Sequence, residues 1–515
     1  MPKLYMETFG CQMNVLDSEL VLSQLRAHGY QSVEDRDLAD VILYNTCSVR
    51  EHAEQKVWSR LGELRQRKKD QPGLVLGVIG CMAEREGKSI FQKFPHVDIL
   101  CGPGELDKLA SMVHNACTTS GHNGDPHSDL TDGAGGTHDH AFPSLNPSAR
   151  RQVALMGSTV RRSSTLAAAE DHLENLDLSR SISASDDVAQ AYVRITRGCN
   201  KFCTYCVVPY TRGPEVHRPP QNIIDEVKML NDAGAKEVTL LGQTINHYKH
   251  VGTDGRITTF AELLYQIHEA TPNLPRLRFV TSFPRDFGDD ALQAMRDCPR
   301  ICRYLHVPAQ HGSNRILKLM NRGYTVEQYK DFFGRAKEMM PDLSVASDFI
   351  VGFPTETDEE FEQTCELIRY CRFKNSFIFK YSPRPGTTAI ERFEDDVPDD
   401  VKKVRNNALL AVQQQICLEN NQSMIGKTLE VMIEGMSKHA SAAVVENGVE
   451  LGANLKRRAR IGGGETVVQL TGRTRGDLVV AFEGIASMKG EILDVEIVDA
   501  KGMTLFGRIA RPVIA

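Results

Sequence analysis

The sequence predicts an α/β protein of three parts: an N-terminal parallel α/β domain, a central incomplete (β/α)6 barrel and a small C-terminal antiparallel β-barrel. Over residues 1–117 and 185–417, strand-length apolar runs alternate with helix-length segments, which is typical of parallel sheets. Over 420–511, apolar runs follow one another between glycine-rich turns. The stretch 118–184 is rich in Gly, Ser, Asp and His, which predicts a flexible insertion or linker, with AAAEDHLENLDL at 167–178 as a candidate for one short helix.

Composition is typical of a soluble globular protein with several domains. The chain has 515 residues, 41% apolar and 25% charged, and a net charge of −6. Nucleic-acid binding would therefore need a local basic patch. We read no signal peptide and no apolar run of membrane-spanning length, so we expect a cytoplasmic, monomeric protein with no membrane contact. Thirteen cysteines in a reducing compartment indicate metal ligands or catalytic thiols rather than disulfides.

In the N-terminal domain, each expected strand is a short apolar run that ends at a turn. Strands are expected at 3–10, 40–45, 73–80 and 96–100. Asp17 is placed to cap a helix that ends near Gly29, which stands where a C′ glycine belongs. A long polar helix is expected over 50–69.

The central region repeats a strand and a helix six times. The strand-length runs are AYVRIT at 191–196, KEVTLLG at 236–242, RLRFVTS at 276–282, YLHVPA at 304–309, VASDFIVG at 345–352 and SFIFKYS at 376–382. Six βα units suit an incomplete barrel, whose chemistry lies at the carboxyl ends of its strands. The C-terminal barrel is expected from the runs at 427–435, 465–474, 477–484 and 491–500.

Three cysteines lie close together directly after the first barrel strand. Cys199, Cys203 and Cys206 have the spacing C-x3-C-x2-C. Three thiolates suit a [4Fe–4S] cube with one iron left open, and an open metal position can bind and polarise a small ligand. The alternative is a zinc knuckle completed by a distant His or Cys, which this spacing disfavours.

The cysteine spacing, with Tyr205 before the third cysteine, resembles the radical S-adenosylmethionine (SAM) superfamily. The resemblance implies that the open iron chelates SAM and that one electron cleaves it to a 5′-deoxyadenosyl radical. The remaining barrel strand ends would then cradle SAM. The candidate SAM contacts are Tyr205, Gln243, Asn246, Gln310, Ser313, Asp348 and Gly352.

A second set of cysteines follows the first three strands of the N-terminal domain. Cys11, Cys47 and Cys81 each stand in the turn after a strand. Residues beyond the carboxyl ends of neighbouring parallel strands converge on one crevice, so the three thiols can meet. A second three-thiolate cluster is one interpretation, and ordinary buried cysteines are the other. Cys101 also follows a strand, so position alone makes it a possible fourth ligand.

The motifs TFGCQMN, NTCSVR and GCMAE, followed by RGCNKFCTYCVVPYTRG, resemble the methylthiotransferase family, with the MiaB type nearest. This resemblance spans roughly 1–110 and 190–510 and assigns no ligand at Cys101. It implies that Cys11, Cys47 and Cys81 hold an auxiliary [4Fe–4S] cluster whose open iron carries sulfur. It also implies methylthiolation of carbon 2 of N(6)-dimethylallyladenosine at tRNA position 37, in the anticodon loop, together with an electron donor and a sulfur source as partners.

Two alternative functions stay open at this point. The first is a sister methylthiotransferase that acts on threonylcarbamoyl-adenosine in tRNA or on a ribosomal protein. The second is a non-enzymatic iron–sulfur protein that binds RNA and whose clusters are fully ligated.

The C-terminal barrel carries the strongest basic patch. A solvated charge run is the alternative on charge alone, but the position and glycine-rich β pattern resemble the TRAM domain, which implies RNA binding. The candidate RNA contacts are Lys456, Arg457, Arg458, Arg460, Arg473 and Arg475.

Overall fold

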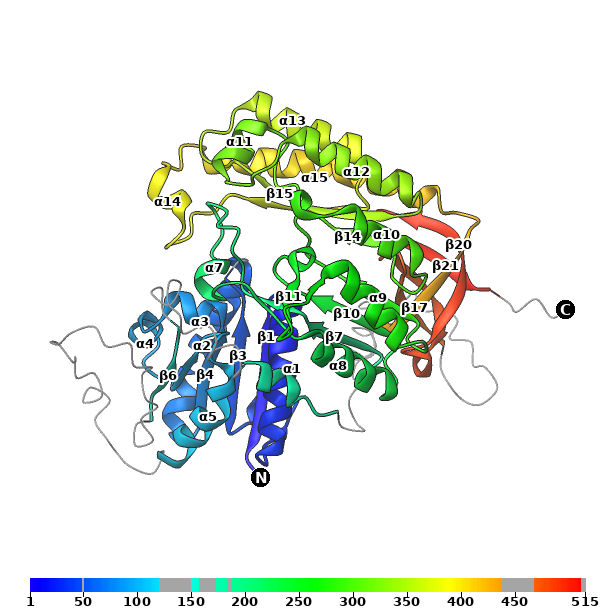
Figure 1. Cartoon of the computed structure of the whole chain (residues 1–515). Coiled ribbons are helices and arrows are strands. Elements are labelled where there is room, and N and C mark those ends of the chain that lie inside the picture. Colours follow the sequence, from blue (N-terminus) through cyan, green and yellow to red (C-terminus); the bar gives the residue numbers. More distant parts are fainter. Residues whose placement is uncertain (49–50, 120–149, 157–172, 183–187, 438–466, 511–515) are drawn as a thin grey trace, which may run out of the picture. The chain divides into compact units, whose positions relative to one another are not determined.

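The computed structural model describes most of the chain, in two compact units (Figure 1). The described residues are 1–48, 51–119, 150–156, 173–182, 188–437 and 467–510. The first unit comprises Met1–Asp186, Tyr192–Ile223 and Leu241–Gln243, and the second unit comprises Asp187–Ala191, Ile224–Leu240 and Thr244–Ala515. The first barrel strand and the cysteine loop after it thus belong largely with the N-terminal domain, whereas the sequence predicts a boundary at 185.

The first unit is built on a six-stranded parallel sheet of order β2-β1-β3-β4-β5-β6. Its strands are β1 (Lys3–Phe9), β2 (Gln31–Ser32), β3 (Val41–Thr46), β4 (Val75–Gly80), β5 (Ile99–Cys101) and β6 (Gln152–Ala154). Every residue of β3 and β4 is buried, as expected for central strands covered on both faces. Tyr44, Leu76, Val78 and Met82 belong to the core that packs here.

Helices follow the strands of this sheet as the sequence predicts, with one difference at the first helix. They are α1 (Gln12–Ala27), α2 (Glu51–Asp70), α3 (Cys81–Glu86), α4 (Ser89–Lys93) and α5 (Leu109–Thr118). The prediction that Asp17 caps α1 is wrong, because α1 begins directly after Cys11 and Asp17 is fully buried inside it. Gly29 does lie just past the end of α1, with φ at +86°.

The expected linker over 118–184 contains two ordered stretches. Gln152–Ala154 adds the edge strand β6 to the sheet, with Leu100 paired to Val153. Residues 173–178 form a short helix that carries Glu174 and Asp177 into buried ion pairs. The helix falls within 167–178, where the sequence indicates one short helix. The strand β6 has no apolar periodicity and is held by strand pairing, so the sequence does not predict it.

The central barrel contains the six expected strands in two parallel groups of three. The orders are β13-β10-β7 and β14-β15-β16. The strands are β7 (Gln190–Arg194), β10 (Glu237–Leu241), β13 (Arg276–Phe279), β14 (Tyr304–His306), β15 (Ser344–Val351) and β16 (Asn375–Lys380). A parallel bridge between Leu277 and Ile301 continues the pairing from β13 toward β14. The fold class predicted from the sequence is therefore confirmed.

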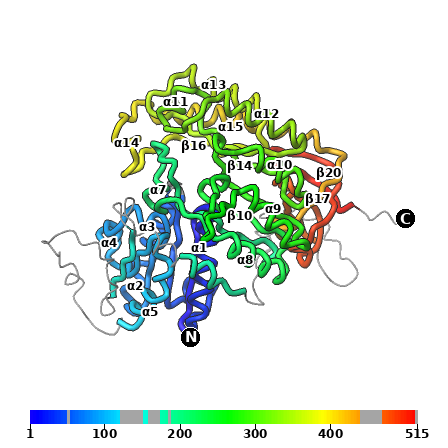
Figure 2. Tube along the Cα trace, viewed as in Figure 1, coloured from blue at the N-terminus to red at the C-terminus, as the bar shows by residue number. Residues whose placement is uncertain are grey.

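Helices alternate with these strands, and several begin with clear capping signals. The helices are α7 (Val208–Thr211), α8 (Pro220–Asp232), α9 (Phe260–Ala270), α10 (Asp289–Asp297), α11 (Asn314–Leu319), α12 (Val326–Met339), α13 (Asp358–Cys371), α14 (Thr388–Arg392) and α15 (Asp399–Gln422). Thr259, Thr325 and Thr357 each form a capping box with the residue three positions on. Helices α12, α13 and α15 lie along one side of β14–β16, as the tube view also shows (Figure 2).

Two short hairpins and a small closed barrel complete the fold. The hairpins pair β8 (Thr196–Arg197) with β9 (Val216–His217), and β11 (Lys249–Val251) with β12 (Ile257–Thr259). The C-terminal barrel closes in the order β17-β18-β19-β21-β20. Its strands are β17 (Thr428–Met436), β18 (Val467–Thr474), β19 (Val479–Ile485), β20 (Ile492–Lys501) and β21 (Thr504–Ile509).

The C-terminal barrel differs from the wholly antiparallel one that the sequence predicts. The pair β19–β21 is parallel, because β20 lies between them in the chain and pairs with β17 and β21. Val431, Leu470, Val480, Phe482 and Val495 fill its interior. None of the helices in the described part of the chain combines the length and apolar character that a membrane crossing requires.

Candidate active site

The three N-terminal cysteines come together at the carboxyl edge of the first sheet. β1, β3 and β4 are neighbours, and Cys11, Cys47 and Cys81 each follow one of them. The Cys47 thiol hydrogen-bonds to Cys11, and Cys81 lies near enough for the charge of Cys11 to act on it. The first unit thus gathers three thiols that stand 36 and 34 residues apart in the chain.

The protonation of these thiols depends on their surroundings. The hydrogen bond from Cys47 holds the pKa of Cys11 well below its usual range, against the effect of burial and with help from the Arg212 charge. Burial raises the pKa of Cys81, and the Arg212 charge opposes that rise. Because the thiolate is the form that ligates metals, Cys11 is already suited to a ligand role.

A buried pair of asparagines lies beneath these cysteines. Asn14 and Asn45 are fully buried. The Cys11 thiol donates to Asn14 Oδ1 at 3.2 Å, and Asn14 Nδ2 donates to Asn45 Oδ1 at 2.9 Å. Asn45 Nδ2 in turn donates to the Asn14 carbonyl at 2.8 Å and to Ser18 Oγ at 3.0 Å. Sequence reasoning missed this pair, although Asn45 is a polar residue in an apolar strand two positions before Cys47.

Gly80 lets the third cysteine approach the others. Its φ of +88° suits glycine, and a Cβ there would stand 2.3 Å from Asn45 Oδ1 and 2.9 Å from the Thr46 carbonyl. The turn at Gly80 ends β4 and starts α3 at Cys81. The asparagine pair and this glycine therefore fix where Cys81 stands.

The second cysteine set lies on a loop closed at its base. The β8–β9 hairpin precedes and follows it, and Cys199 N donates to the Gly213 carbonyl at 3.1 Å. Gly198 has φ at +65°, and a Cβ there would lie 1.8 Å from the Pro214 carbonyl. Cys199 and Cys203 are 9% and 8% exposed, and Cys206 N donates to the Cys203 carbonyl at 3.0 Å. Buried thiols on so short a loop fit a cluster with few protein ligands.

A single metal ion is not the group that these cysteines suit. Among the residues that the structure describes, no group of three or more His, Cys, Asp or Glu side chains is placed to hold one ion. A [4Fe–4S] cube is wider than an ion, so its thiolates need not converge on one point.

A buried chain of ion pairs runs from the cysteine loop into α1. Arg212 Nη2 stands 2.9 Å from Asp17 Oδ2, and Arg194 Nη1 stands 2.7 Å from Asp17 Oδ1. Arg194 also pairs with Asp177 at 2.5 Å. Asp17 is 0% exposed and Arg194 2%, so the pairing takes place away from water. These residues stand up to 195 positions apart, and sequence reasoning missed the network.

The helix at 173–178 belongs to the same network. Asp177 also pairs with Arg197, and Glu174 receives hydrogen bonds from Arg218 Nε at 3.0 and 2.9 Å. The three arginines lower the pKa of Asp177 against the effect of its burial. The residues that flank the cysteine loop are thus bonded to the segment expected to be a linker.

Cys101 stands apart from the cysteine groups in its bonding. It ends β5, is fully buried, and its thiol donates to the Glu105 carbonyl at 3.3 Å. Burial raises the pKa of Cys101 well above its usual range. Its thiol also faces the Gly102 carbonyl at 3.6 Å, whereas Cys11 and Cys47 bond to each other, so the bonding favours the structural interpretation of Cys101.

The candidate SAM contacts divide between the two units. Tyr205 and Gln243 lie in the first unit. In the second unit, Asn246 exchanges both amide hydrogen bonds with the Phe283 backbone, at 2.7 and 3.0 Å. Gln310 has φ at +72°, and its backbone bridges to β15. Asn246 therefore shapes a strand end through the backbone that it holds.

The three remaining candidates lie after β14 and along β15. His306 Nε2 lies 3.0 Å from Asp348 Oδ1, and both side chains are partly exposed. Gly352 has φ at +68°, and a Cβ there would stand 2.3 Å from Lys402 Cγ. Ser313 caps α11, and its Oγ donates to Glu360 Oε1 at 2.8 Å. Of the three, Asp348 has the side chain best placed to meet a ligand.

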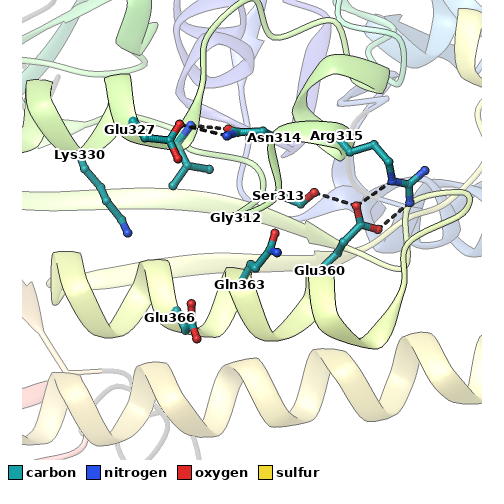
Figure 3. Close-up of a pocket in the computed structure, with 10 residues that line it drawn as sticks. Gly312, Ser313, Asn314, Arg315, Glu327, Lys330, Glu360, Gln363 and Glu366 are labelled. Carbon is teal, nitrogen blue, oxygen red and sulfur yellow. Dashed lines mark hydrogen bonds and ion pairs between the residues drawn. The ribbon is translucent and has the colours of Figure 1, made fainter.

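Ser313 lies on the side of the barrel that the helices cover. It lines a polar cavity of about 430 Å³ beside α11, α12 and α13 (Figure 3). There Arg315 Nε donates to Glu360 Oε1 at 2.8 Å, and Asn314 Nδ2 donates to Glu327 Oε2 at 3.0 Å. Several of the side chains that line this cavity thus bond to one another.

The candidate RNA contacts are only partly described. Lys456, Arg457, Arg458 and Arg460 lie outside the described residues. Arg473 Nε donates to Glu434 at 2.8 Å and its Nη1 to Asp477 at 3.0 Å. Arg475 lies 3.7 Å from Glu430, which also pairs with Arg276 of β13 at 2.8 Å. Arg473 and Arg475 therefore already serve the packing of the C-terminal barrel inside the second unit.

The fold and the cysteine loop define a radical SAM protein, and family comparison agrees. Residues 193–368 match the radical SAM superfamily. Residues 3–102 match the family described as Uncharacterized protein family UPF0004. Membership of the radical SAM superfamily implies a [4Fe–4S] cluster and SAM.

Full-length relatives identify the family more narrowly. The chain is 43% identical over 98% of its length to the tRNA-2-methylthio-N(6)-dimethylallyladenosine synthase of Rhodopirellula baltica, and covers 95% of that protein. It is 38% identical over 99% of both chains to the enzyme of the same name from Neisseria gonorrhoeae. The chain belongs to the tRNA-2-methylthio-N(6)-dimethylallyladenosine synthase family.

A solved structure supports the fold. The radical S-adenosylmethionine methyltransferase TsrM from Kitasatospora setae, with cobalamin and a [4Fe–4S] cluster bound, has a TM-score of 0.51 to this chain. The match covers 76% of this chain and 77% of TsrM at 15% identity. At that identity the likeness concerns the fold alone.

Proposed function

We propose that this chain is a tRNA methylthiotransferase, which adds a methylthio group to carbon 2 of N(6)-dimethylallyladenosine at position 37. The names of its full-length relatives support the substrate. One observation of the structure carries the reaction class: a second group of three thiols, at Cys11, Cys47 and Cys81, in the same compact unit as the cysteine loop. A radical SAM protein that only cleaves SAM has no need of this second group.

We propose that Cys199, Cys203 and Cys206 hold one [4Fe–4S] cluster and that Cys11, Cys47 and Cys81 hold another. When bound, the first supplies the electron that cleaves SAM, and the second carries the sulfur that is methylated and transferred. The chain lowers the pKa of Cys11 through the hydrogen bond from Cys47 and buries Cys47, Cys81, Cys199 and Cys203.

The carbon that is modified explains why the proposed reaction uses no side chain as a general base. A hydrogen on an aromatic ring carbon is not acidic enough for a side-chain base to remove. The work of this chain is therefore positioning. Among the SAM candidates we assign the polar contacts to Tyr205, Gln243, Gln310 and Asp348. Asn246, Ser313 and Gly352 shape the strand ends through the bonds and close approach described above.

The RNA substrate must present an unstacked base. A base inside a stem is out of reach, whereas an anticodon-loop adenosine can enter a pocket. We assign backbone recognition to the C-terminal barrel. Because Arg473 and Arg475 have carboxylate partners within the second unit, the phosphate contacts fall to Lys456, Arg457, Arg458 and Arg460.

Mass spectrometry of tRNA nucleosides from a strain that lacks this gene tests the proposal. We expect the 2-methylthio form of dimethylallyladenosine to disappear, the form without sulfur to accumulate, and the wild-type gene to reverse both. Unchanged 2-methylthio nucleosides would overturn the tRNA assignment. Loss of sulfur from the threonylcarbamoyl nucleoside or from a ribosomal protein instead would identify a sister enzyme.

A second experiment separates an enzyme from a non-enzymatic iron–sulfur protein. The purified chain is reconstituted with iron and sulfide without oxygen, reduced, and mixed with SAM. We expect 5′-deoxyadenosine to form. Its complete absence from a preparation with full iron content contradicts radical chemistry.

A further inference from the structure

Arg212 lies in the sequence just after the cysteine loop, but its side chain contacts the N-terminal cysteine group. It follows α7, six positions after Cys206, and its side chain is 6% exposed. The guanidinium donates to Asp17 Oδ2 at 2.9 Å and also hydrogen-bonds to Cys81. Helix α7 itself packs against α3, which starts at Cys81. All of these residues lie in the first unit.

The buried guanidinium of Arg212 keeps its positive charge. A guanidinium stays protonated in proteins, and the Asp17 carboxylate stands 2.9 Å from Arg212 Nη2 as its counter-ion. Asp17 carries one negative charge and contacts two guanidiniums, those of Arg194 and Arg212. Arg194 also pairs with Asp177, which pairs with Arg197 as well, and Arg218 pairs with Glu174. The connected network thus holds four arginines against three carboxylates, and one positive charge is left over.

We propose that Arg212 is a positioning residue for the cluster held by Cys11, Cys47 and Cys81, and that its charge raises the reduction potential of that cluster. This inference rests on the proposed function, because it takes those three cysteines as ligands. Through Arg212, the loop that carries one set of ligands also orients a ligand of the other set.

The sign of the effect follows from electrostatics. Reduction adds one electron, and hence one negative charge, to the cluster. A buried cation close by stabilises the reduced form more than the oxidised form, and so does a hydrogen bond to a ligating sulfur. Removing the charge of Arg212 therefore makes the potential more negative. Removing the charge of Asp17 makes it more positive, because Arg212 is then less compensated.

The test uses the full-length chain with Cys199, Cys203 and Cys206 all replaced by alanine, so that only the proposed second cluster remains. Redox titration with dithionite, followed by electron paramagnetic resonance, measures its potential. Relative to this parent, we expect a negative shift for Arg212→Gln, a smaller shift for Arg212→Lys, which keeps the charge, and a positive shift for Asp17→Asn.

Arg26→Gln is the matched control. Arg26 lies in the last turn of the helix that carries Asp17, and at 1.5 Å per residue it is about 22 Å from Cys11 along α1. The same loss of one positive charge there should leave the potential unchanged. A shift equal to that of Arg212→Gln would show a general effect of net charge and overturn the proposal.

The outcomes separate the failure of this inference from the failure of the proposed function. A parent that holds no cluster contradicts the second cluster itself. If the parent holds a cluster and Arg212→Gln leaves its potential unchanged, the role of Arg212 is overturned. Equal shifts in Arg212→Lys and Arg212→Gln overturn it as well. If Arg212→Gln does not fold, the potential of the Asp17→Asn variant is the test. The absence of a positive shift in that potential then overturns the proposal.

Discussion

At the scale of single residues, the N-terminal thiols differ in what they are bonded to. Cys47 and Cys11 bond to each other, whereas the Cys101 thiol donates to a backbone carbonyl at 3.3 Å. Cys11 and Cys47 follow strands of one sheet and Cys101 ends another strand of it, so the sequence positions alone do not distinguish the three. Their hydrogen-bond partners separate them, and this difference leads to a direct test.

We predict that Cys47→Ala removes only the second cluster. Iron content should fall from about eight to about four atoms per chain, because one of two four-iron clusters is lost. Formation of 5′-deoxyadenosine should continue and tRNA methylthiolation should stop. Iron analysis and nucleoside mass spectrometry measure the two effects. Cys101→Ala is the matched control and should keep the full iron content; a loss of four iron atoms there would assign Cys101 as a ligand.

We predict that Asn45→Ala destabilises the first unit. Asn45 is fully buried and supplies an acceptor to Asn14 and donors to the Asn14 carbonyl and Ser18. Truncation leaves buried polar groups unsatisfied, which costs about 1–3 kcal/mol. Urea unfolding without metal measures it, and exposed Gln31→Ala is the control. A change below about 0.5 kcal/mol, as at ordinary surface sites, would contradict a structural role for the pair.

We predict that the contribution of His306 to stability decreases as pH rises. Burial acts to lower the pKa of His306, but Asp348, with help from Asp477 and against Lys374, raises it above the usual 6.5. A raised pKa in the folded state stabilises the protein below pH 6.5, and this gain is lost as pH rises through the folded value.

Urea unfolding at pH 5.5 and pH 8.5, conditions chosen about one to two units on either side of the usual histidine pKa, checks the sign. Wild type should exceed His306→Gln in stability by more at the lower pH. An advantage that is equal at both values, or larger at the higher one, would show that protonated His306 is not paired with Asp348 in the folded state.

At the scale of elements, one buried arginine joins the two barrels of the second unit. Arg276 of β13 is fully buried and donates to Glu430 Oε1 at 2.8 Å, to the Glu430 carbonyl at 3.1 Å and to the Arg473 carbonyl at 2.9 Å. Its partners belong to β17 and β18. The C-terminal barrel is therefore held to the end of a central strand by directed bonds.

We predict that Arg276→Ala loosens the C-terminal barrel. The variant leaves two partly buried carbonyls, those of Glu430 and Arg473, without this donor, which costs about 1–3 kcal/mol each at most. Limited proteolysis should then cut faster near Ser423–Lys427, where α15 leads into β17. Arg335→Ala removes an exposed arginine paired with Asp331 at 3.0 Å, where surface pairs contribute about 0–1 kcal/mol. Equal cleavage rates in the two variants would contradict the proposed link.

At the scale of the whole molecule, RNA binding must come from a limited patch, because the chain carries a net charge of −6. We predict that replacing Lys456, Arg457, Arg458 and Arg460 by Gln weakens tRNA binding and reduces its salt dependence. Each lost phosphate contact lowers the slope of log K against log salt by about 0.7–0.9. Filter binding over a salt series measures the slope.

Arg473→Gln is the control for this prediction, because Arg473 already pairs with Glu434 and Asp477. Its slope should stay near that of wild type. A larger loss of slope in Arg473→Gln than in the fourfold variant would place the RNA contact on the strands of the barrel.

Much of the architecture follows from local patterns. Apolar runs predict β1, β3 and β4, and the alternation of strands and helices predicts six βα units, because burial imposes its period directly on the chain. The short strand β6 has no such period. The sequence indicates a short helix within 167–178 but not its ion pairs. Strand pairing holds β6 and ion pairs hold the helix, and a local pattern does not predict a partner elsewhere in the chain.

By itself the sequence predicted that Cys11, Cys47 and Cys81 come together, since residues that follow neighbouring strands of a parallel sheet meet at one edge. Only the tertiary structure decided the role of Asp17, which the sequence placed at a helix start. Its partners Arg194 and Arg212 stand 177 and 195 residues away. Burial makes such pairing necessary, because a carboxylate removed from water needs a cation, and only the folded chain brings that cation to it.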